Sequence, residues 1–212
     1  KKMSKVFGYP EYDEKGEKIL TTYDNEYKAM MMDIRVYRMK AGETRTFLRE
    51  GEETAVLLLS GNITYKWNGN EAAATRKDVF TEGPWCVHGC TGTEIAVVAN
   101  AESQILVQCT KNEKDFGARL YKPEDAPWGY SSVGKFGNVA KRRVNTIFDH
   151  DISPESNMVL GEVKSVSDSE ITIAVGTMKE MGQPGGDGQN GGAPDGNGQG
   201  GEAPSMLDLT GE

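Results

Sequence analysis

Short apolar stretches recur about every ten residues between residues 30 and 109, with turn-forming residues between them. In residues 30–36, apolar side chains at the even positions alternate with other residues, and this period of two is typical of a half-buried strand. Further strands are predicted over 54–59, 63–67, 95–98 and 105–109. Because no window shows sustained i, i+3, i+4 apolar spacing, the chain is predicted to be all-β, an antiparallel sandwich or barrel.

Glycine-containing segments indicate where the predicted strands end. Ser60-Gly61-Asn62 is predicted to turn the chain between the strands over 54–59 and 63–67. Asn68-Gly69 is a dipeptide preferred in two-residue type I′ hairpins, because both positions favour positive φ. Gly83-Pro84 is predicted to be a further turn. The alternation alone does not distinguish a jelly roll from an immunoglobulin-like sandwich.

The C-terminal stretch is too polar to form a core. Ten of the twenty residues from 182 to 201 are glycine, and the others are Gln, Asn, Asp, Pro and Ala. Since little apolar surface offsets the entropy of ordering such a segment, residues 178–212 are expected to be a disordered Gly-rich acidic tail. We predict an N-terminal domain over 3–110, a long connection over 111–163 and a short β-hairpin over 164–177.

Composition argues against several classes of protein. The net charge is −8, but all 24 Lys and Arg lie at or before Lys179 and six acidic residues follow it. The body is therefore nearly neutral, which argues against nucleic-acid binding. The longest strongly apolar run, 55–59, is far too short for a membrane span, and the N-terminus lacks the apolar core of a signal peptide. Three cysteines do not suggest a disulfide framework, so the expected location is the cytoplasm.

One cluster has the composition of a metal site. Cys86, His88 and Cys90 would project to one face of an extended strand, where Cys109 could complete a zinc site of three cysteines and one histidine. The spacing is not that of a usual zinc motif. Free thiols and a Cys86–Cys90 disulfide are the alternatives. The other histidine, His150, lies between two aspartates in a turn-like stretch and is expected to be solvated.

Three glutamates, Glu50, Glu52 and Glu53, surround Gly51. Paired carboxylates can perform acid–base chemistry when their environments separate their pKa values. Three of them on one glycine-containing loop are more typical of a solvated hairpin tip, which is our interpretation. The chain has no Gly-x-Ser-x-Gly motif, and its Gly134–Gly137 segment lacks the phosphate-loop pattern.

Three segments carry a resemblance to a known family. They are Leu59-Ser60-Gly61-Asn62-Ile63-Thr64, the Arg76…Val79-Phe80…Pro84 segment, and a bridge with Gly134-Lys135-Phe136-Gly137-Asn138, Arg142-Arg143-Val144-Asn145-Thr146-Ile147 and Met158-Val159-Leu160-Gly161-Glu162-Val163. Over about 160 residues the chain resembles the N-terminal half of 5-deoxy-glucuronate isomerase, a bicupin enzyme of myo-inositol breakdown. The resemblance implies a cupin jelly roll and aldose–ketose isomerisation of a sugar acid.

The resemblance also implies where the family holds its divalent metal. In relatives a second cupin carries a metal site of the form H-x-H…E…H, whereas here the bridge leads into residues 164–167 and the Gly-rich tail. The metal-binding half is therefore expected to be missing, activity to be impaired, and no cofactor to bind this chain. No catalytic residue transfers. Lys135, Arg142 and Arg143 are candidates for binding a substrate carboxylate, because Arg pairs with it bidentately; tying two cupins together is their alternative role.

Two classes of function stay open at this point. The first is an isomerase of this family, and the second is a non-catalytic cupin module or a chimeric fragment that acts by binding. The last 50 or so residues weakly resemble Gly-rich repeats of secreted Gram-positive proteins. Candidate partners are a sugar acid and a second copy of the chain. The apolar face of residues 158–163 is expected to have lost its partner sheet, so either a hairpin over 166–175 covers it or a second copy binds there.

Overall fold

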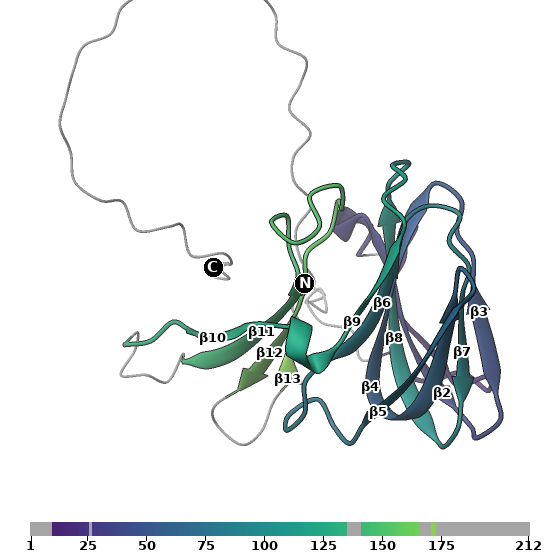
Figure 1. Cartoon of the computed structure of the whole chain (residues 1–212), viewed down its shortest axis with the longest axis horizontal. Coiled ribbons are helices and arrows are strands. Elements are labelled where there is room, and N and C mark those ends of the chain that lie inside the picture. The colour runs from purple at the N-terminus through teal and green to yellow at the C-terminus, as the bar shows by residue number, and fades with distance from the viewer. Residues whose placement is uncertain (1–9, 26, 135–140, 166–170, 173–212) are drawn as a thin grey trace, which may run out of the picture. The chain divides into compact units, whose positions relative to one another are not determined.

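A computed structural model describes residues 10–25, 27–134, 141–165 and 171–172. Antiparallel strands make up nearly all of its regular structure, so the all-β prediction is confirmed (Figure 1). The strands are β1 (Glu17–Thr21), β2 (Met32–Met39), β3 (Thr44–Phe47), β4 (Glu52–Trp67), β5 (Asn70–Arg76), β6 (Trp85–Gly89), β7 (Ile95–Ala99), β8 (Ser103–Lys111), β9 (Ala118–Tyr121), β10 (Trp128–Ser131), β11 (Arg142–Phe148), β12 (Leu160–Ser165) and β13 (Ile171–Thr172). Single 3₁₀ turns lie at Lys28–Met30 and Pro123–Asp125. No described helix is long and apolar enough to span a bilayer.

Two sheets share the long strand β4. Sheet A has the order β1-β2-β8-β4-β6-β9. In sheet B, β4 lies between β5 and β7, and β7 also pairs with β3. The first part of β4, through Ser60, pairs with β8, and the part from Gly61 onward pairs with β5. This one strand therefore connects the two sheets.

The predicted turn at Ser60-Gly61-Asn62 is wrong, because the chain bends there without reversing. Gly61 has a φ of +115°, a conformation that glycine adopts readily and other residues rarely do. The Asn62 N–H donates to Ser103 Oγ at 3.1 Å, which fastens the bend to β8. The segments predicted as two strands, 54–59 and 63–67, are thus one strand that passes from sheet A to sheet B.

The Asn68-Gly69 hairpin is confirmed. Both residues have positive φ, 45° and 74°, and Trp67 pairs with Asn70 across the two-residue turn. Strand β5, which follows, was not predicted. Its sequence contains Ala72, Ala73 and Ala74, and alanine has little intrinsic preference for strands. Pairing with β4, rather than local propensity, accounts for this strand.

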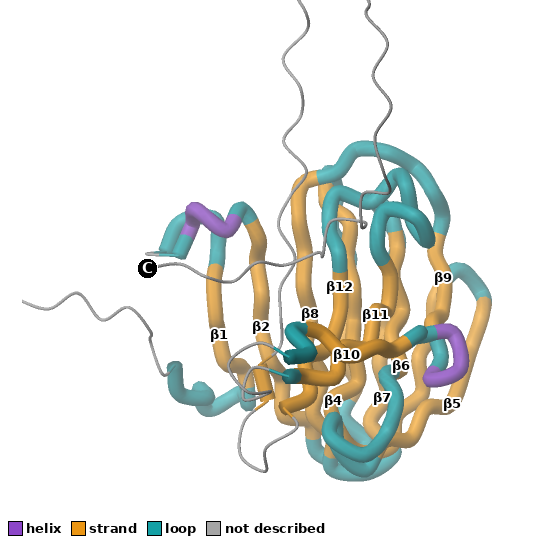
Figure 2. Tube along the Cα trace, turned by 90° about the vertical axis from the view of Figure 1, so that its left-hand side faces the viewer, coloured by secondary structure: helices purple, strands orange, loops and turns teal. Residues whose placement is uncertain are grey.

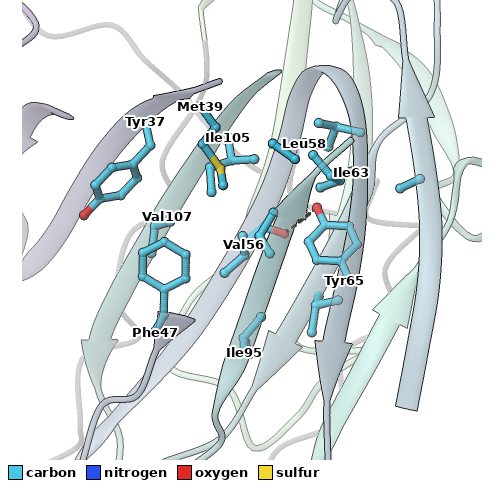
Figure 3. Packing of buried hydrophobic residues seen from close by; sticks show 14 of the residues in the cluster. Tyr37, Met39, Phe47, Val56, Leu58, Ile63, Tyr65, Ile95, Ile105 and Val107 are labelled. Atoms are coloured by element: carbon cyan, nitrogen blue, oxygen red, sulfur yellow. Dashed lines mark hydrogen bonds between the residues drawn. The ribbon is translucent and has the colours of Figure 1, made fainter. Parts of the chain in front are cut away.

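The inner core cluster fills the space between sheets A and B (Figure 3). Its buried members are Tyr37, Met39, Phe47, Val56, Leu58, Ile63, Tyr65, Ala74, Val87, Ile95, Val97, Ala99, Ile105, Val107 and Cys109. The Tyr65 hydroxyl is satisfied inside this cluster, donating toward the carbonyl oxygens of Val56 at 3.1 Å and Trp85 at 3.0 Å. Burial of these side chains is the main source of stability for the two-sheet domain.

The opposite face of sheet A is covered by the later part of the chain. Strands β10, β11, β12 and β13 form sheet C in that order. An outer core cluster joins sheet A to the β11–β12 region, which overlies β8 and β6 in Figure 2. Its buried members are Met32, Ile34, Val36, Ala55, Leu57, Cys86, Leu106, Tyr121, Ile147, Phe148, Met158 and Leu160.

The expectation of an uncovered apolar face at residues 158–163 is wrong for Met158 and Leu160. Both side chains are fully buried in the outer core cluster, because the connecting segment folds back onto sheet A. All of the predicted tail, 178–212, and most of the predicted hairpin, 164–177, lie outside the described residues.

Candidate functional site

The interior between sheets A and B does not suit a metal ion. Val56, Leu58, Val87, Ile105 and Val107 are buried there and offer no donor atoms from their side chains. A structural or catalytic divalent cation needs several N, O or S ligands that converge. Within the described ranges, no group of three His, Cys, Asp or Glu side chains is placed to hold one. The divalent metal that the family resemblance implies therefore does not fit this interior.

The four residues proposed for a zinc site are not brought together. Cys86 lies in the outer core cluster and Cys109 in the inner one, so sheet A separates their side chains. The Cys90 thiol lies 3.2 Å from Asp115 Oδ1, where it can donate a hydrogen bond. All three cysteines are free and buried, so the Cys86–Cys90 disulfide is absent.

The buried thiols should react slowly with thiol reagents in the native protein. Burial raises the pKa of the Cys109 thiol to about 11. At pH 8 about one such thiol in a thousand is the reactive thiolate. We expect little modification of Cys109 by Ellman's reagent in native protein at pH 8, and reaction of all three thiols in urea. Rapid labelling of native Cys109, located by peptide mass, would contradict this burial.

His88 is the centre of a buried polar group on the outer face of sheet A. Its side chain is only 1% exposed, and its Nε2 lies 3.1 Å from Glu53 Oε2. The imidazole stacks on the Phe148 ring with 4.1 Å between centroids and 4° between planes. The Phe116 ring also packs against the imidazole, with 5.0 Å between the two ring centroids. The ring is therefore fixed both by packing and by a hydrogen bond.

The interpretation of the three glutamates as a solvated hairpin tip is wrong for Glu52 and Glu53, which are both buried. Strand β4 already begins at Glu52, so Glu53 lies within the strand, and its side chain is fully buried. The Asn157 N–H donates to Oε1 at 2.8 Å, and Asn112 Nδ2 lies 3.4 Å from Oε2. Both Glu53 oxygens accept from N–H groups, so His88 Nε2 is assigned as a donor to Oε2 and Nδ1 is left for other chemistry.

A cavity of about 190 Å³, which we call the His88 pocket, lies beside this pair. Six of its lining residues are His88, Phe116, Arg119, Tyr121, Ser153 and Glu155. Arg119 pairs with His88 across β6 and β9, so the two side chains leave the sheet on the same face. Its guanidinium lies over the Tyr121 ring, 4.8 Å from the centroid. Burial raises the pKa of the Tyr121 hydroxyl, which keeps it protonated and able to donate.

Two of the predicted carboxylate ligands, Arg142 and Arg143, do not line the His88 pocket. Lys135 lies outside the described residues, and Arg142 and Arg143 are on β11. Arg143 lies over the ring of Trp128 at 4.4 Å from the centroid. Trp128 is 57% exposed, so this cation–π pair lies at the surface rather than in an enclosed pocket.

Sequence reasoning missed a buried ion pair that joins sheet C to sheet B. Arg76 on β5 and Glu162 on β12 make two hydrogen bonds of 2.6 Å each, and both side chains are almost fully buried. Arg76 belongs to one family-like segment and Glu162 to another. Their occurrence in these two segments was the one signal in the sequence that could have pointed to the pair. No local pattern predicts a contact between residues 86 positions apart.

Sheets A and B together form a cupin-type jelly roll, and the comparisons with known proteins agree with this fold. The chain belongs to the KduI/IolB family, a family of sugar-acid isomerases, whose sequence model matches residues 8–170. No curated protein sequence matches the chain.

Several solved structures share the fold at low sequence identity. An IolB-like protein from Salmonella typhimurium LT2 is 18% identical, with a TM-score of 0.55 over 62% of this chain and 49% of that one. A putative glyoxylate-induced protein from Pseudomonas aeruginosa is 10% identical, with a TM-score of 0.53 over 70% of this chain and 55% of that one. YlbA from E. coli is 16% identical, with a TM-score of 0.51 over 73% of this chain and 59% of that one. The chain thus spans about half the length of the IolB-like protein.

Proposed function

We propose that this chain acts in the aldose–ketose isomerisation of a sugar acid, with 5-deoxy-glucuronate of inositol breakdown as the substrate. Membership of the KduI/IolB family over residues 8–170 is the observation that carries this proposal. The described residues add one place with suitable chemistry, the His88 pocket. The proposal concerns the reaction and the pocket together, and each is open to a separate test.

The reaction sets clear requirements for such a pocket. A base removes the proton from C2, next to the C1 aldehyde, and a proton is returned to C1. Meanwhile O1 gains a proton and O2 loses one, so the enediol collapses to a ketose. This chemistry needs a positioned base and donors for the developing oxyanion.

The His88 pocket offers both kinds of group. His88 Nδ1 would serve as the base, since Glu53 binds Nε2 and would stabilise the imidazolium that forms. The Tyr121 hydroxyl is a donor that lines the same cavity. None of these roles requires a group outside the described residues.

Turnover of 5-deoxy-glucuronate by the purified chain tests the proposal, with Mn²⁺ or Zn²⁺ supplied and then removed by a chelator. We expect turnover that survives chelation, and a loss of about 100-fold or more in kcat in His88→Gln, because the base is removed. His150→Gln is the matched control and should retain the wild-type rate. Absence of turnover in protein that circular dichroism shows to be folded would overturn the isomerase proposal.

A non-catalytic cupin module is the second candidate. The apolar side chains between sheets A and B favour it, because cupin chemistry at a metal needs donors in that interior. In this case the folded chain would bind a sugar acid without converting it. The same assay, combined with a binding measurement, separates the two candidates.

A further inference from the structure

We propose that the His88 pocket recognises the carboxylate of a small acid, which pairs with the Arg119 guanidinium. This deepens the proposed function by naming the substrate group that the pocket binds, and it rests on that function for the choice of a sugar acid as ligand. Binding is nevertheless measured separately from turnover, so either proposal can fail alone.

Arg119 has the features of an anion-binding residue. It stands directly opposite His88 on the edge strand β9, and it is exposed at the pocket. Among the described residues it has no hydrogen-bonded or carboxylate partner, and its one recorded contact is with the Tyr121 ring. A guanidinium that rests on an aromatic ring keeps its N–H groups available for bidentate pairing with a carboxylate.

His88 lines the same pocket from inside the protein. With Nε2 bound to Glu53, Nδ1 stays available as the base of the proposed function, so the carboxylate is left to Arg119. Because the ring is stacked on Phe148, its direction is set before a ligand arrives.

The remaining groups in the pocket limit what it can bind. Its volume of about 190 Å³ corresponds to about six water molecules, which suits a small molecule rather than a polymer. The Tyr121 and Ser153 side chains add hydroxyl groups for a polyhydroxylated ligand. Glu155 also lines the pocket, but it forms an ion pair with Lys114 at 2.9 Å, so a counter-charge already accompanies this carboxylate.

Titration of D-glucuronate into the wild-type chain, followed by isothermal calorimetry or by NMR, tests the inference. We expect Arg119→Gln to weaken the Kd at least tenfold and Arg143→Gln to change it less than twofold. Arg143 is the informative comparison because it is the rival carboxylate ligand on β11. D-glucose, which lacks the carboxylate, should bind at least tenfold more weakly than D-glucuronate.

Each alternative outcome overturns the inference. These outcomes are equal binding of D-glucose, a larger loss in Arg143→Gln than in Arg119→Gln, or no binding of D-glucuronate to folded protein at 10 mM. Since Arg119 is exposed, its replacement is expected to leave the fold intact, which circular dichroism checks. D-glucuronate binding that depends on Arg119, without turnover of 5-deoxy-glucuronate, would remove the isomerase proposal and leave this one standing.

Discussion

Replacement of Glu162 with Ala is expected to lower the free energy of unfolding by about 3–5 kcal/mol, because it leaves the Arg76 charge buried without a counter-charge. The Arg76 side chain is 0% exposed, and its two short bonds to Glu162 are those of a bidentate pair. Its remaining recorded bonds go to the carbonyl oxygens of Leu58 and Glu82, which are neutral. Neither carbonyl can replace the lost carboxylate.

Urea denaturation followed by circular dichroism measures this loss. The matched control is Glu71→Ala, which breaks the Lys66–Glu71 pair, whose side chains are 51% and 61% exposed. Exposed pairs contribute about 1 kcal/mol or less, so the control should be nearly neutral. A double variant, Arg76→Met with Glu162→Leu, should recover much of the stability, because no charge is then left buried. A Glu162→Ala variant within 1 kcal/mol of wild type would show that the pair does not hold sheet C in place.

The features that the sequence could predict are those with a local signal. The period-two pattern in residues 30–36 and the Asn68-Gly69 turn depend on neighbouring residues. The turn is where it was predicted, whereas the strand begins only at Met32, because Met30 lies in a 3₁₀ turn. The cupin fold came from a family resemblance spread over most of the chain, and the KduI/IolB match confirms it. Local patterns and a family likeness therefore sufficed for the fold class.

The candidate site could not be predicted in the same way, because it depends on long-range pairing. Glu53 looked like a loop residue beside Gly51, yet it meets His88 from a strand 35 residues away. The apolar stacking partner of that histidine, Phe148, comes from the long connection over 111–163, for which no contact with the N-terminal domain was predicted. No spacing rule links these three residues, since sheet register and the folding back of β11 bring them together.

Gly61 shows how one residue can decide between a turn and a bend, and its replacement has the second large expected effect. We expect Gly61→Ala to lower the free energy of unfolding by about 2–6 kcal/mol, the sum of backbone strain and overpacking. Its φ of +115° is a conformation that residues with a side chain rarely adopt. A Cβ at this position would also lie 2.2 Å from Ser103 Oγ and 2.6 Å from Ser103 Cα.

Gly69→Ala separates these two causes, because Gly69 shares a positive φ but not the crowding. Its φ is +74°, and a Cβ there would meet nothing within 4 Å. This variant should cost only about 1 kcal/mol, the strain of a left-handed alanine. Removing the Ser103 side chain in a Gly61→Ala/Ser103→Gly double variant relieves the contacts with Oγ and Cβ, but neither the 2.6 Å contact with Cα nor the strain, so it should recover only part of the loss. If Gly61→Ala and Gly69→Ala lowered the free energy of unfolding equally, β4 would be able to pass between the sheets without this close approach to β8.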